Sequence, residues 1–418
     1  MRKNDRRRYE KNMETKINIL TAEAADLLKE MIATPSESFS EEKVCTHICN
    51  WMSSKGLAYK RIGNNITARL SEQPGICPEA FEGKPTLMLC AHIDTVKASG
   101  DYSFDPYCPD YTKAAEVINA KIAGGILPEA PKPAVSENDI VAGLGSNDDG
   151  ASVVSMIAAF RYFAERSFDS ADARLRMTDA AMSSTVETSA DLLLVLSCEE
   201  ERSGKGGMTG LWSTIKDEVN LAIIGEPTGM KAATSERGLL VIDATAHGVS
   251  GHAARNEGIN AIDIAMGDIA AIKAHQFTKI SPRMGKVNIN VTQINAGTAH
   301  NVIPDTCTFV IDIRPTEQYT NEEILAELQS ICRSDLKARN LSNRSSATAE
   351  DSPLQKAAES LGIETFSSPT TSDWMRIDCD AIKMGPGNSS RSHKKDEFVF
   401  VDEIAGGIRT YIDFIENF

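Results

Sequence analysis

Four short apolar runs along the chain are continuous rather than alternating. They are PTLMLCAHIDTV (85–96), DLLLVLSCEEE (191–201), NLAIIGEPTG (220–229) and the run that opens AIKMGPGNSSRSHKKDE (381–397). Apolar runs of about four to eight residues are typical of strands buried on both faces of a parallel sheet. The helical pattern GASVVSMIAAFRYFAER (150–166) lies between two of them. We therefore predict an α/β domain with a mainly parallel sheet and helices on both faces.

The middle of the chain alternates apolar and polar positions instead. LLVIDATAHG, GKVNINVTQINAG and CTFVIDIRPT, at 239–248, 285–297 and 307–316, have the pattern of half-exposed antiparallel strands. GINAIDIAMGDIAAIKAH (258–275) and NEEILAELQSICRSDLKARN (321–340) predict amphipathic helices. These elements predict an inserted α+β domain of ferredoxin-like type at 234–346. The α/β domain is then discontinuous, with parts at 13–233 and 347–418.

Three stretches fit neither pattern. Residues 105–138 are rich in Pro, Ala and Gly, and residues 168–190 in Ser, Ala, Asp and Thr. We interpret both as insertions without an obvious strand or recognisable chemistry. Residues 1–12, MRKNDRRRYEKN, are basic but lack the apolar core of a secretory signal. We interpret them as a disordered tail or a start-site artefact, because helical periodicity begins at Met13.

The composition excludes several classes of protein. With 41% hydrophobic and 25% charged residues, the chain of 418 residues has the composition of a soluble globular protein of two or three domains. No run approaches the ~18 apolar residues of a membrane span. A net charge of −15 disfavours nucleic acid as a partner. Nine scattered cysteines include no CxxC pair, which disfavours a disulfide framework and favours a reducing cytoplasm.

Polar residues collect where the apolar runs end. In chain order they are His92 and Asp94, Glu199 to Glu201, Glu226 and His393. Open α/β sheets place their sites at the carboxyl ends of strands. Three adjacent glutamates repel one another, so they need a cation or a solvated face. Taken singly, the glutamate run also fits a solvent-facing helix start, and the His-x-Asp pair also fits a structural histidine.

The segment VAGLGSNDDGAS (141–152) has two glycines of a G-x-G-x-x-G dinucleotide loop. Asp148 stands where the third glycine belongs, and an anion has no use in a phosphate cradle, so we reject nucleotide binding. Asp148 and Asp149 fit a place beside a metal ion. They fit equally well an acidic turn that caps the helix beginning at residue 150.

Taken together, these residues form a metal-ligand set. Histidines, aspartates and glutamates at several strand ends suit zinc or a similar divalent ion. Two metals that share one bridging carboxylate would need about this many ligands, with centres ~3.5–4 Å apart. Neighbours on an extended segment face opposite ways, so we expect Glu200 and Glu201 to have different roles. A serine hydrolase is disfavoured because the sequence has no G-x-S-x-G elbow.

Seven motifs make the chain resemble the dinuclear zinc amidohydrolase family of acetylornithine deacetylase, succinyl-diaminopimelate desuccinylase, aminoacylase and glutamate carboxypeptidase. They are AHIDTV, GLGSNDDGAS, CEEERSGKGG, IIGEPTG, SGHAARNEGINAI, NAGTAHNVIPD and GPGNSSRSHKKDE. They follow the family order from about residue 14 to the end. The branch they resemble most contains acetylornithine and acyl-citrulline deacetylases, although SPTTSDW (368–374) replaces the more usual Gly-Gly-Thr-Asp segment.

The resemblance implies a role for each residue of the ligand set. His92 would bind one metal and be oriented by Asp94, and Asp148 would bridge both metals through a segment whose Asp148–Asp149 peptide is cis. Glu200 would be the general base, and Glu201 a ligand. Glu226 and His393 would complete the shells of the first and second metal. Glu199 takes the place of the family's usual Asp.

The resemblance also implies the cofactors and the role of the inserted domain. The cofactors are two divalent metal ions, zinc by expectation, with cobalt as a substitute. The inserted domain would act as a lid and dimerisation domain, so the chain would form a homodimer in the cytoplasm without nucleic acid or membrane. His252 would reach the active site of the partner subunit. A surface loop histidine is the alternative.

Four further residues are expected to bind substrate. Asn301 and Arg314 match positions that hold the substrate's carboxylate, and Arg314 is otherwise a strand-end surface charge. Gly387 belongs to the GPG turn of the last motif. Arg391 would pair with a succinyl carboxylate, or would be a solvated charge.

The reaction implied is hydrolysis of the amide bond of an N-acyl amino acid, of the N-acetyl or N-succinyl ornithine or citrulline type, in arginine biosynthesis. Glu200 would take a proton from water and return it to the departing amine, while His252 helps to stabilise the oxyanion. Two alternatives remain open. One is a dipeptidase or carboxypeptidase with the same metals, and the other is a metal-binding dimer without catalysis, which the presence of Glu200 disfavours.

Overall fold

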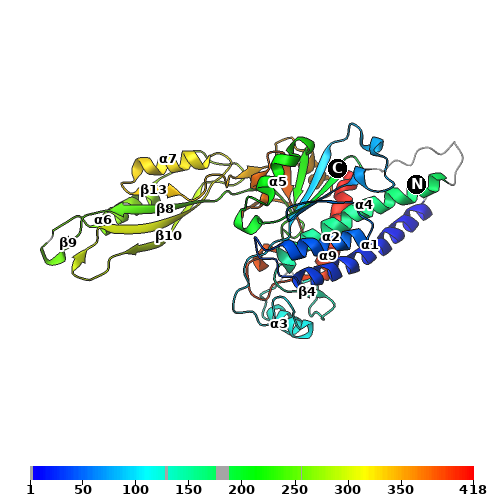
Figure 1. Ribbon diagram of the computed structural model, residues 1–418, viewed down its shortest axis with the longest axis horizontal. Helices are drawn as coiled ribbons and strands as arrows, with labels where there is room; N and C mark the ends of the chain where they lie inside the picture. The colour runs from blue at the N-terminus through cyan, green and yellow to red at the C-terminus, as the bar shows by residue number, and fades with distance from the viewer. Residues whose placement is uncertain (1–2, 128–129, 176–187, 256) are drawn as a thin grey trace. The chain divides into compact units, whose positions relative to one another are not determined.

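The computed structural model describes residues 3–127, 130–175, 188–255 and 257–418 (Figure 1). The chain divides into two compact units. The first comprises Met1–Ala233, Thr348–Thr365 and Arg376–Phe418, and the second comprises Thr234–Ala347 and Phe366–Met375. The first unit is therefore discontinuous in sequence.

A mixed sheet forms the centre of the first unit. Its strands follow the order β1-β2-β5-β3-β6-β16. They are β1 (Lys60–Ile62), β2 (Asn65–Arg69), β3 (Thr86–His92), β5 (Asp191–Ser197), β6 (Leu221–Ile224) and β16 (Asp380–Lys383). The four strands from β5 to β16 are parallel, and β1 and β2 join them antiparallel. The prediction of a mainly parallel sheet is confirmed.

Strand β7 (Ala232–Glu236) carries the chain from the first unit into the second. Its first half pairs antiparallel with β16, where Ala233 lies opposite Lys383. Its second half pairs with the short strand β14 (Ser346–Ala347), and β15 (Thr365–Ser368) also lies on it.

The apolar runs of the sequence are the parallel strands themselves. Every residue of β3, β5 and β6 is buried. A strand covered on one face only would alternate between buried and exposed residues, so both faces of these three strands are covered. This explains why the runs PTLMLCAH and DLLLVLS contain no regular polar position.

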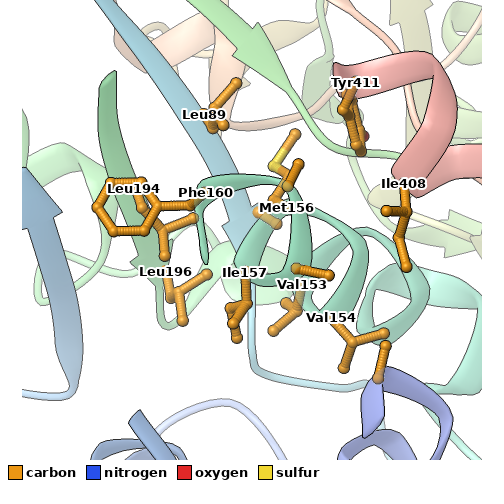
Figure 2. Close-up of a cluster of buried hydrophobic side chains, with 14 of the residues drawn as sticks. Leu89, Val153, Val154, Met156, Ile157, Phe160, Leu194, Leu196, Ile408 and Tyr411 are labelled. Atoms are coloured by element: carbon orange, nitrogen blue, oxygen red, sulfur yellow. The ribbon is translucent and has the colours of Figure 1, made fainter. Parts of the chain in front are cut away.

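Seven α-helices belong to the described part of the first unit. They are α1 (Lys3–Ile32), α2 (Glu42–Ser54), α3 (Tyr111–Ala123), α4 (Ala151–Leu175), α5 (Met208–Ile215), α8 (Pro353–Ser360) and α9 (Val401–Asn417). Helices α1, α4 and α9 pack on one another. Figure 2 shows Phe160 of α4 beside Leu194 and Leu196 of β5 in the core. Each large apolar side chain buried in this way contributes ~1.5–3 kcal/mol to stability.

The structure adds detail at the three stretches that fitted no pattern. Helix α1 begins at Lys3, upstream of Met13, so the described part of the basic stretch is helical. Residues 105–138 contain α3, which packs near a two-stranded sheet of β4 (Ile140–Ala142) and β17 (Phe398–Phe400). Of residues 168–190, those up to Leu175 continue α4, and 176–187 lie outside the described residues.

The second unit has the chain order β8–α6–β10–β12–α7–β13, which is the β-α-β-β-α-β pattern of ferredoxin-like domains. Its elements are β8 (Leu240–His247), α6 (Ala261–Ala274), β10 (Asn288–Ala296), β12 (Thr306–Arg314), α7 (Asn321–Ile331) and β13 (Asp335–Ala338). The four strands form an antiparallel sheet in the order β10-β12-β8-β13. Residues of β8 alternate between buried and half-buried up to the exposed His247 at its end, as one covered face requires. The ferredoxin-like prediction is confirmed.

One helix of the second unit is shorter than predicted. The amphipathic pattern indicated a helix over 321–340, but α7 ends at Ile331 and residues 335–338 form β13. The chain leaves the helix where the buried Asp268 accepts hydrogen bonds from the backbone N–H groups of Arg333 and Ser334, at 2.9 and 2.8 Å. The following residues then complete the edge of β8. Pairing with a distant strand outweighs local helical periodicity here.

No helix in the described ranges combines the length and the apolar character needed to cross a membrane.

Candidate metal centre

Neighbouring parallel strands place three of the predicted site segments at one edge of the sheet. His92 ends β3 and lies opposite Ser197 of β5, just before the glutamate run. Cys90 lies opposite Ile224 of β6, so Glu226 is reached two positions beyond the end of that pairing. The carboxyl ends of parallel strands meet at the same edge. The register of these strands therefore brings the three segments close together at the carboxyl edge of the sheet.

Asp94 fixes the orientation of His92. The Nδ1 atom of His92 lies 3.0 Å from the carbonyl oxygen of Asp94 and 3.4 Å from its carboxylate. Its Nε2 atom faces Asp148 at 3.2 Å. The Asp94 carboxylate also accepts hydrogen bonds from the backbone N–H groups of Glu200 and Glu201, at 3.0 and 3.2 Å. Asp94 thus links the end of β3 to the glutamate run and leaves Nε2 of the histidine directed at the cluster.

The loop that carries Asp148 is held from both sides. The Asp148–Asp149 peptide is cis, as predicted. The carboxylate of Glu397 accepts hydrogen bonds from the backbone N–H groups of Gly145, Asn147 and Asp148, at 3.1, 2.9 and 2.9 Å. The Asn147 side chain makes paired hydrogen bonds with the backbone of Asn388, at 2.8 and 3.1 Å. The Asp148 loop and the last motif are therefore locked together.

The glutamate run does not continue the strand. Strand β5 ends at Ser197, Glu199 has a left-handed conformation with φ 58°, and Glu200–Arg202 form a 3₁₀ turn. The argument from an extended segment is therefore wrong here, because turn geometry separates the side chains. The Glu201 carboxylate lies 3.0 Å from Nε2 of His393, and Glu200 belongs to neither of the two ligand groups described below.

Glu199 explains the glycines that follow it. Its carboxylate accepts a hydrogen bond from the backbone N–H of Gly206 at 2.8 Å. A Cβ on Gly204 would lie 2.0 Å from that carboxylate, and one on Gly206 would lie 2.4 Å from it. Both contacts are closer than non-bonded atoms tolerate. Glu199 is thus a structural residue that folds the glycine-rich segment back over itself.

The cluster contains two groups of possible metal ligands that share one residue. His92, Asp148 and Glu226 form one group, and Asp148, Glu201 and His393 form the other. Within each group the ligand atoms all lie within 4.8 Å of one another. Asp148 contributes one carboxylate oxygen toward each histidine, at 3.2 Å from His92 and 3.6 Å from His393. The shared carboxylate has the position of a bridge between two ions.

Burial and neighbouring charges shift the pKa values of the carboxyl groups in this cluster. Burial raises the pKa of Glu226 well above its usual value, and the charge of Asp148 adds to the effect. Burial also raises the pKa of Asp149 to about 8. For Asp148, burial is outweighed by the hydrogen bond and charge of His92, which lower its pKa. Carboxylates packed this closely need positive charge to remain ionised.

The histidines respond in the opposite direction. The hydrogen bond to Glu201 raises the pKa of His393 to about 9. Burial would lower the pKa of His92, but hydrogen bonds to Asp148 and Asp94 raise it well above its usual value, and the nearby charge of Glu200 contributes. Imidazole nitrogen and carboxylate oxygen are donors suited to zinc and similar ions. The donor set, with its shared carboxylate and excess of acids, therefore fits two divalent cations.

The last motif contains a residue whose role the sequence analysis missed. Glu397 is buried, and burial raises the pKa of its carboxyl to about 8, with the charge of Asp148 adding to the effect. Its three backbone hydrogen bonds shape the loop that presents Asp148. The only sequence signal was its place at the end of GPGNSSRSHKKDE, four residues after His393.

Replacing Glu397 with alanine is expected to lower the free energy of unfolding by about 2–4 kcal/mol, because three buried N–H groups lose their acceptor. Glu397→Gln should cost less, since its amide oxygen can still accept from Asn147 and Asp148. Urea unfolding followed by circular dichroism measures both. Glu364→Ala, which removes an exposed partner of Lys231 at 2.7 Å, is the matched control and should change stability by under ~0.5 kcal/mol. Similar losses for Glu397→Ala and Glu364→Ala would contradict this role.

The 105–138 insertion and the residues just before it brace the loop that carries His393. The buried Asp396 accepts hydrogen bonds from the backbone N–H and the hydroxyl of Ser103, at 2.6 and 3.1 Å. Its carboxylate also lies 3.5 Å from Nζ of Lys121 on α3. The hydroxyl of Tyr102 donates to the carbonyl oxygen of Lys394 at 3.2 Å. A stretch without recognisable chemistry thus contributes to the position of a candidate ligand.

The second unit carries His252, Asn301 and Arg314. His252 is exposed in the short strand β9 (Gly251–His252), which pairs with β11 (Val302–Ile303). The carbonyl of the exposed Asn301 accepts a hydrogen bond from the N–H of Ala253 at 3.0 Å, so the structure brings His252 and Asn301 together at the two-stranded β9–β11 sheet. Arg314 ends β12 and binds Asp312 through two nitrogens, at 2.9 and 3.2 Å.

Two residues of the last motif differ from simple substrate contacts. Gly387 has φ 88°, and a Cβ there would lie 2.5 Å from Oδ1 of Asn147, so its glycine permits the close approach of two loops. Arg391 corrects the sequence analysis. It is buried, binds Glu403 through both terminal nitrogens and donates to the carbonyl of Phe398 at 3.1 Å. The prediction that it contacts a succinyl carboxylate is wrong, and it is not a solvated charge.

Comparison with known proteins supports the resemblance of the motifs. A family model described as the peptidase dimerisation domain matches residues 234–340. The acetylornithine deacetylase of Edwardsiella ictaluri (strain 93-146) is 23% identical over 406 residues, which cover 90% of this chain and 93% of that one. The acetylornithine deacetylase of Myxococcus xanthus is 25% identical over 238 residues, which cover 51% of this chain and 62% of that one.

A solved structure shows the same fold. It is that of the M20 family metallo-carboxypeptidase Sso-CP2 from Sulfolobus solfataricus, with a TM-score of 0.67 and 13% sequence identity over 94% of this chain and 99% of that one. The likeness therefore extends over both units and includes the matched dimerisation domain. Together with the ordered motifs, it shows that the chain has the fold of the M20 metallopeptidases and carries a match to their dimerisation domain.

Proposed function

We propose that this protein hydrolyses the amide bond of an N-acyl amino acid, of the N-acetyl or N-succinyl ornithine or citrulline type, with two divalent metal ions. The observation that carries the proposal is the pair of ligand groups that share Asp148. Similarity to two acetylornithine deacetylases supports the substrate class. A role in arginine biosynthesis belongs to the same proposal.

His92, Asp148 and Glu226 would hold one metal ion, and Asp148, Glu201 and His393 the other. Zinc is the proposed metal, with cobalt as a substitute, because the ligands are imidazole and carboxylate groups. When bound, such ions polarise a carbonyl group and lower the pKa of water. Asp94 would keep Nε2 of His92 directed at the ion through its contacts with Nδ1.

Glu200 is the proposed general base. It is half-buried, and its backbone N–H is fixed by Asp94, yet its carboxylate is outside both ligand groups. Its charge contributes to the raised pKa values of His92 and Glu226, which supports a role close to the cluster. It would take a proton from the attacking water and return that proton to the departing amine nitrogen.

The second unit would complete the substrate site in a homodimer. His252 would donate a hydrogen bond to the oxyanion in the partner's site, with Asn301 beside it. Arg314 would hold the α-carboxylate of the substrate. The turn that contains Gly387 would form part of the substrate site. The matched dimerisation domain supports the dimer.

A panel of N-acetyl and N-succinyl amino acids, assayed with the zinc-loaded and cobalt-loaded full chain, tests the proposal. We expect release of free ornithine or citrulline from one acyl series, measured by a ninhydrin assay. The solved metallo-carboxypeptidase with the same fold favours one second candidate, a peptidase. Turnover of dipeptides without turnover of any acyl amino acid would overturn the deacylase proposal in favour of that candidate.

Arg314→Lys is expected to lower kcat/KM by about ten- to a hundredfold, because lysine cannot reproduce the planar fork that binds a carboxylate. Stability should change little, since Arg314 pairs with Asp312 on a partly exposed strand end. Steady-state kinetics on an acyl amino acid and on its methyl ester measure the effect. Equal turnover of acid and ester by the unmodified protein would contradict recognition of the α-carboxylate.

A further inference from the structure

A pocket lies in the first unit, outside the candidate metal centre. It has a volume of about 370 Å³ and opens between the end of α3 with its following turn and the loop before β17. Its lining residues are Lys121, Ile126, Leu127, Ser390, Arg391, Lys394, Lys395, Asp396 and Phe398. Pockets for small molecules occupy about 300–1,000 Å³. The volume is therefore sufficient for a small organic molecule.

Positive charge is concentrated in this pocket although the whole chain carries −15. Three lysines line it, and only Lys121 has an acidic partner, Asp396 at 3.5 Å. Within the described residues, the exposed Lys394 and Lys395 make no ion pair. Arg391 adds no free charge because Glu403 binds its guanidinium. Two unpaired lysines in a concave site attract an anion.

The rest of the lining is apolar and firmly built. Leu127 and Phe398 are buried in the small core that joins the insertion to β4 and β17. Ile126 is 68% exposed and lines the pocket, so it offers apolar surface to a ligand. The Lys394 segment is braced by the hydrogen bonds of Tyr102 and Ser103 to its backbone and to Asp396. The pocket is thus preformed, with a basic wall and an apolar wall.

We propose that this pocket is a binding site for a small organic anion with an apolar body, such as an aryl or alkyl carboxylate. The anionic group would contact Lys394 and Lys395, and the apolar body would lie against Ile126, Leu127 and Phe398. The site does not depend on the proposed amide hydrolysis, although Lys394 directly follows His393 and both sites share one loop.

Isothermal titration of the metal-loaded full chain with 4-phenylbutyrate, and with the neutral 4-phenylbutanol, tests the proposal. We expect saturable binding of the carboxylate at concentrations up to about 10 mM, and at least about tenfold weaker binding of the alcohol. Lys394→Ala with Lys395→Ala should weaken carboxylate binding about tenfold. Lys113→Ala, an exposed lysine of α3 outside the pocket, is the matched control and should leave it unchanged.

A second pair of variants acts from the opposite wall, away from His393. Ile126→Glu should weaken carboxylate binding about tenfold, because it places a negative charge at the pocket. Ile126→Gln introduces a side chain with the shape of glutamate but without its charge, and should not weaken binding. Because Ile126 is exposed, both variants should keep the unmodified melting temperature. Equal carboxylate affinity of Ile126→Glu and Ile126→Gln would show that the ligand binds elsewhere, at the candidate metal centre for example. That result would overturn the proposal. Absence of binding, or equal binding of the alcohol, would overturn it as well.

Discussion

Glu200→Gln is expected to reduce kcat by at least about 10²–10⁴-fold while the protein keeps its full metal content. Glutamine has the size of glutamate but cannot take a proton from water. Glu200 lies outside both ligand groups, so its loss should not release a metal ion. Because the same carboxylate would act twice, first as base and then as acid, the loss can exceed the range for a single proton transfer.

The two neighbouring glutamates provide matched controls for this experiment. Glu201→Gln removes a carboxylate that lies 3.0 Å from His393 within a ligand group, so it should lower metal content as well as activity. Glu199→Gln alters a side chain that holds Gly206, so it should affect stability more than metal content. Metal per chain is measured by plasma mass spectrometry, beside kcat and urea unfolding. Full metal content in Glu201→Gln together with loss in Glu200→Gln would show that the two roles are exchanged.

The layout of the first unit could be predicted because burial on both faces leaves a clear trace in sequence. PTLMLCAH and DLLLVLS lack alternation for the same reason that every residue of β3 and β5 is buried. The prediction that the helix continues over residues 332–340 was wrong for an equally physical reason. That segment has helical periodicity, but its partner is β8, about ninety residues upstream, and no local pattern reveals an open strand edge.

The candidate site shows the same division between local and long-range information. His92, Glu226 and the glutamate run follow apolar strands, and the shared edge of a parallel sheet brings them together. The support of Asp148 by Glu397 joins residues far apart in sequence, so spacing alone could not suggest it. Arg391 was misjudged because its burial and its partner Glu403 depend on the packing of α9 beside the last motif.

The second unit places two of its predicted site residues together and the third far from them. His252 and Asn301 lie together at the two-stranded β9–β11 sheet, next to the start of β12, and Arg314 ends that strand. Strand β12 is 9 residues long, so its two ends are roughly 26 Å apart at ~3.3 Å per residue. A small acyl amino acid cannot span that distance. One copy of the second unit therefore cannot supply His252 and Arg314 to the same substrate, whereas two copies in the proposed dimer could.

This separation leads to the expectation that two inactive variants restore each other when their subunits are exchanged. In a mixed dimer of Glu200→Gln and His252→Ala, one site would combine both defects. The other would combine an intact Glu200 with an intact His252 from the partner. Each mixed dimer should then show about half the activity of an unmodified dimer, and random re-pairing should restore about a quarter overall. Reversible dissociation, mixing and steady-state assay measure the recovery, with subunit exchange followed by differently tagged chains.

A second mixture of variants provides the control, and it follows from the contact between His252 and Asn301. Because His252 and Asn301 are neighbours at the β9–β11 sheet, they would enter the same site together. In a mixed dimer of His252→Ala and Asn301→Ala, each site would receive one damaged β9–β11 sheet, so no recovery beyond the residual activity of the parents is expected. If His252 acted within its own subunit, the first mixture would also fail, because every site would keep one defect. Demonstrated exchange without recovery in the first mixture would therefore rule out the arrangement in trans, and recovery there but not in the second mixture would assign His252 and Asn301 to the partner's site as a unit.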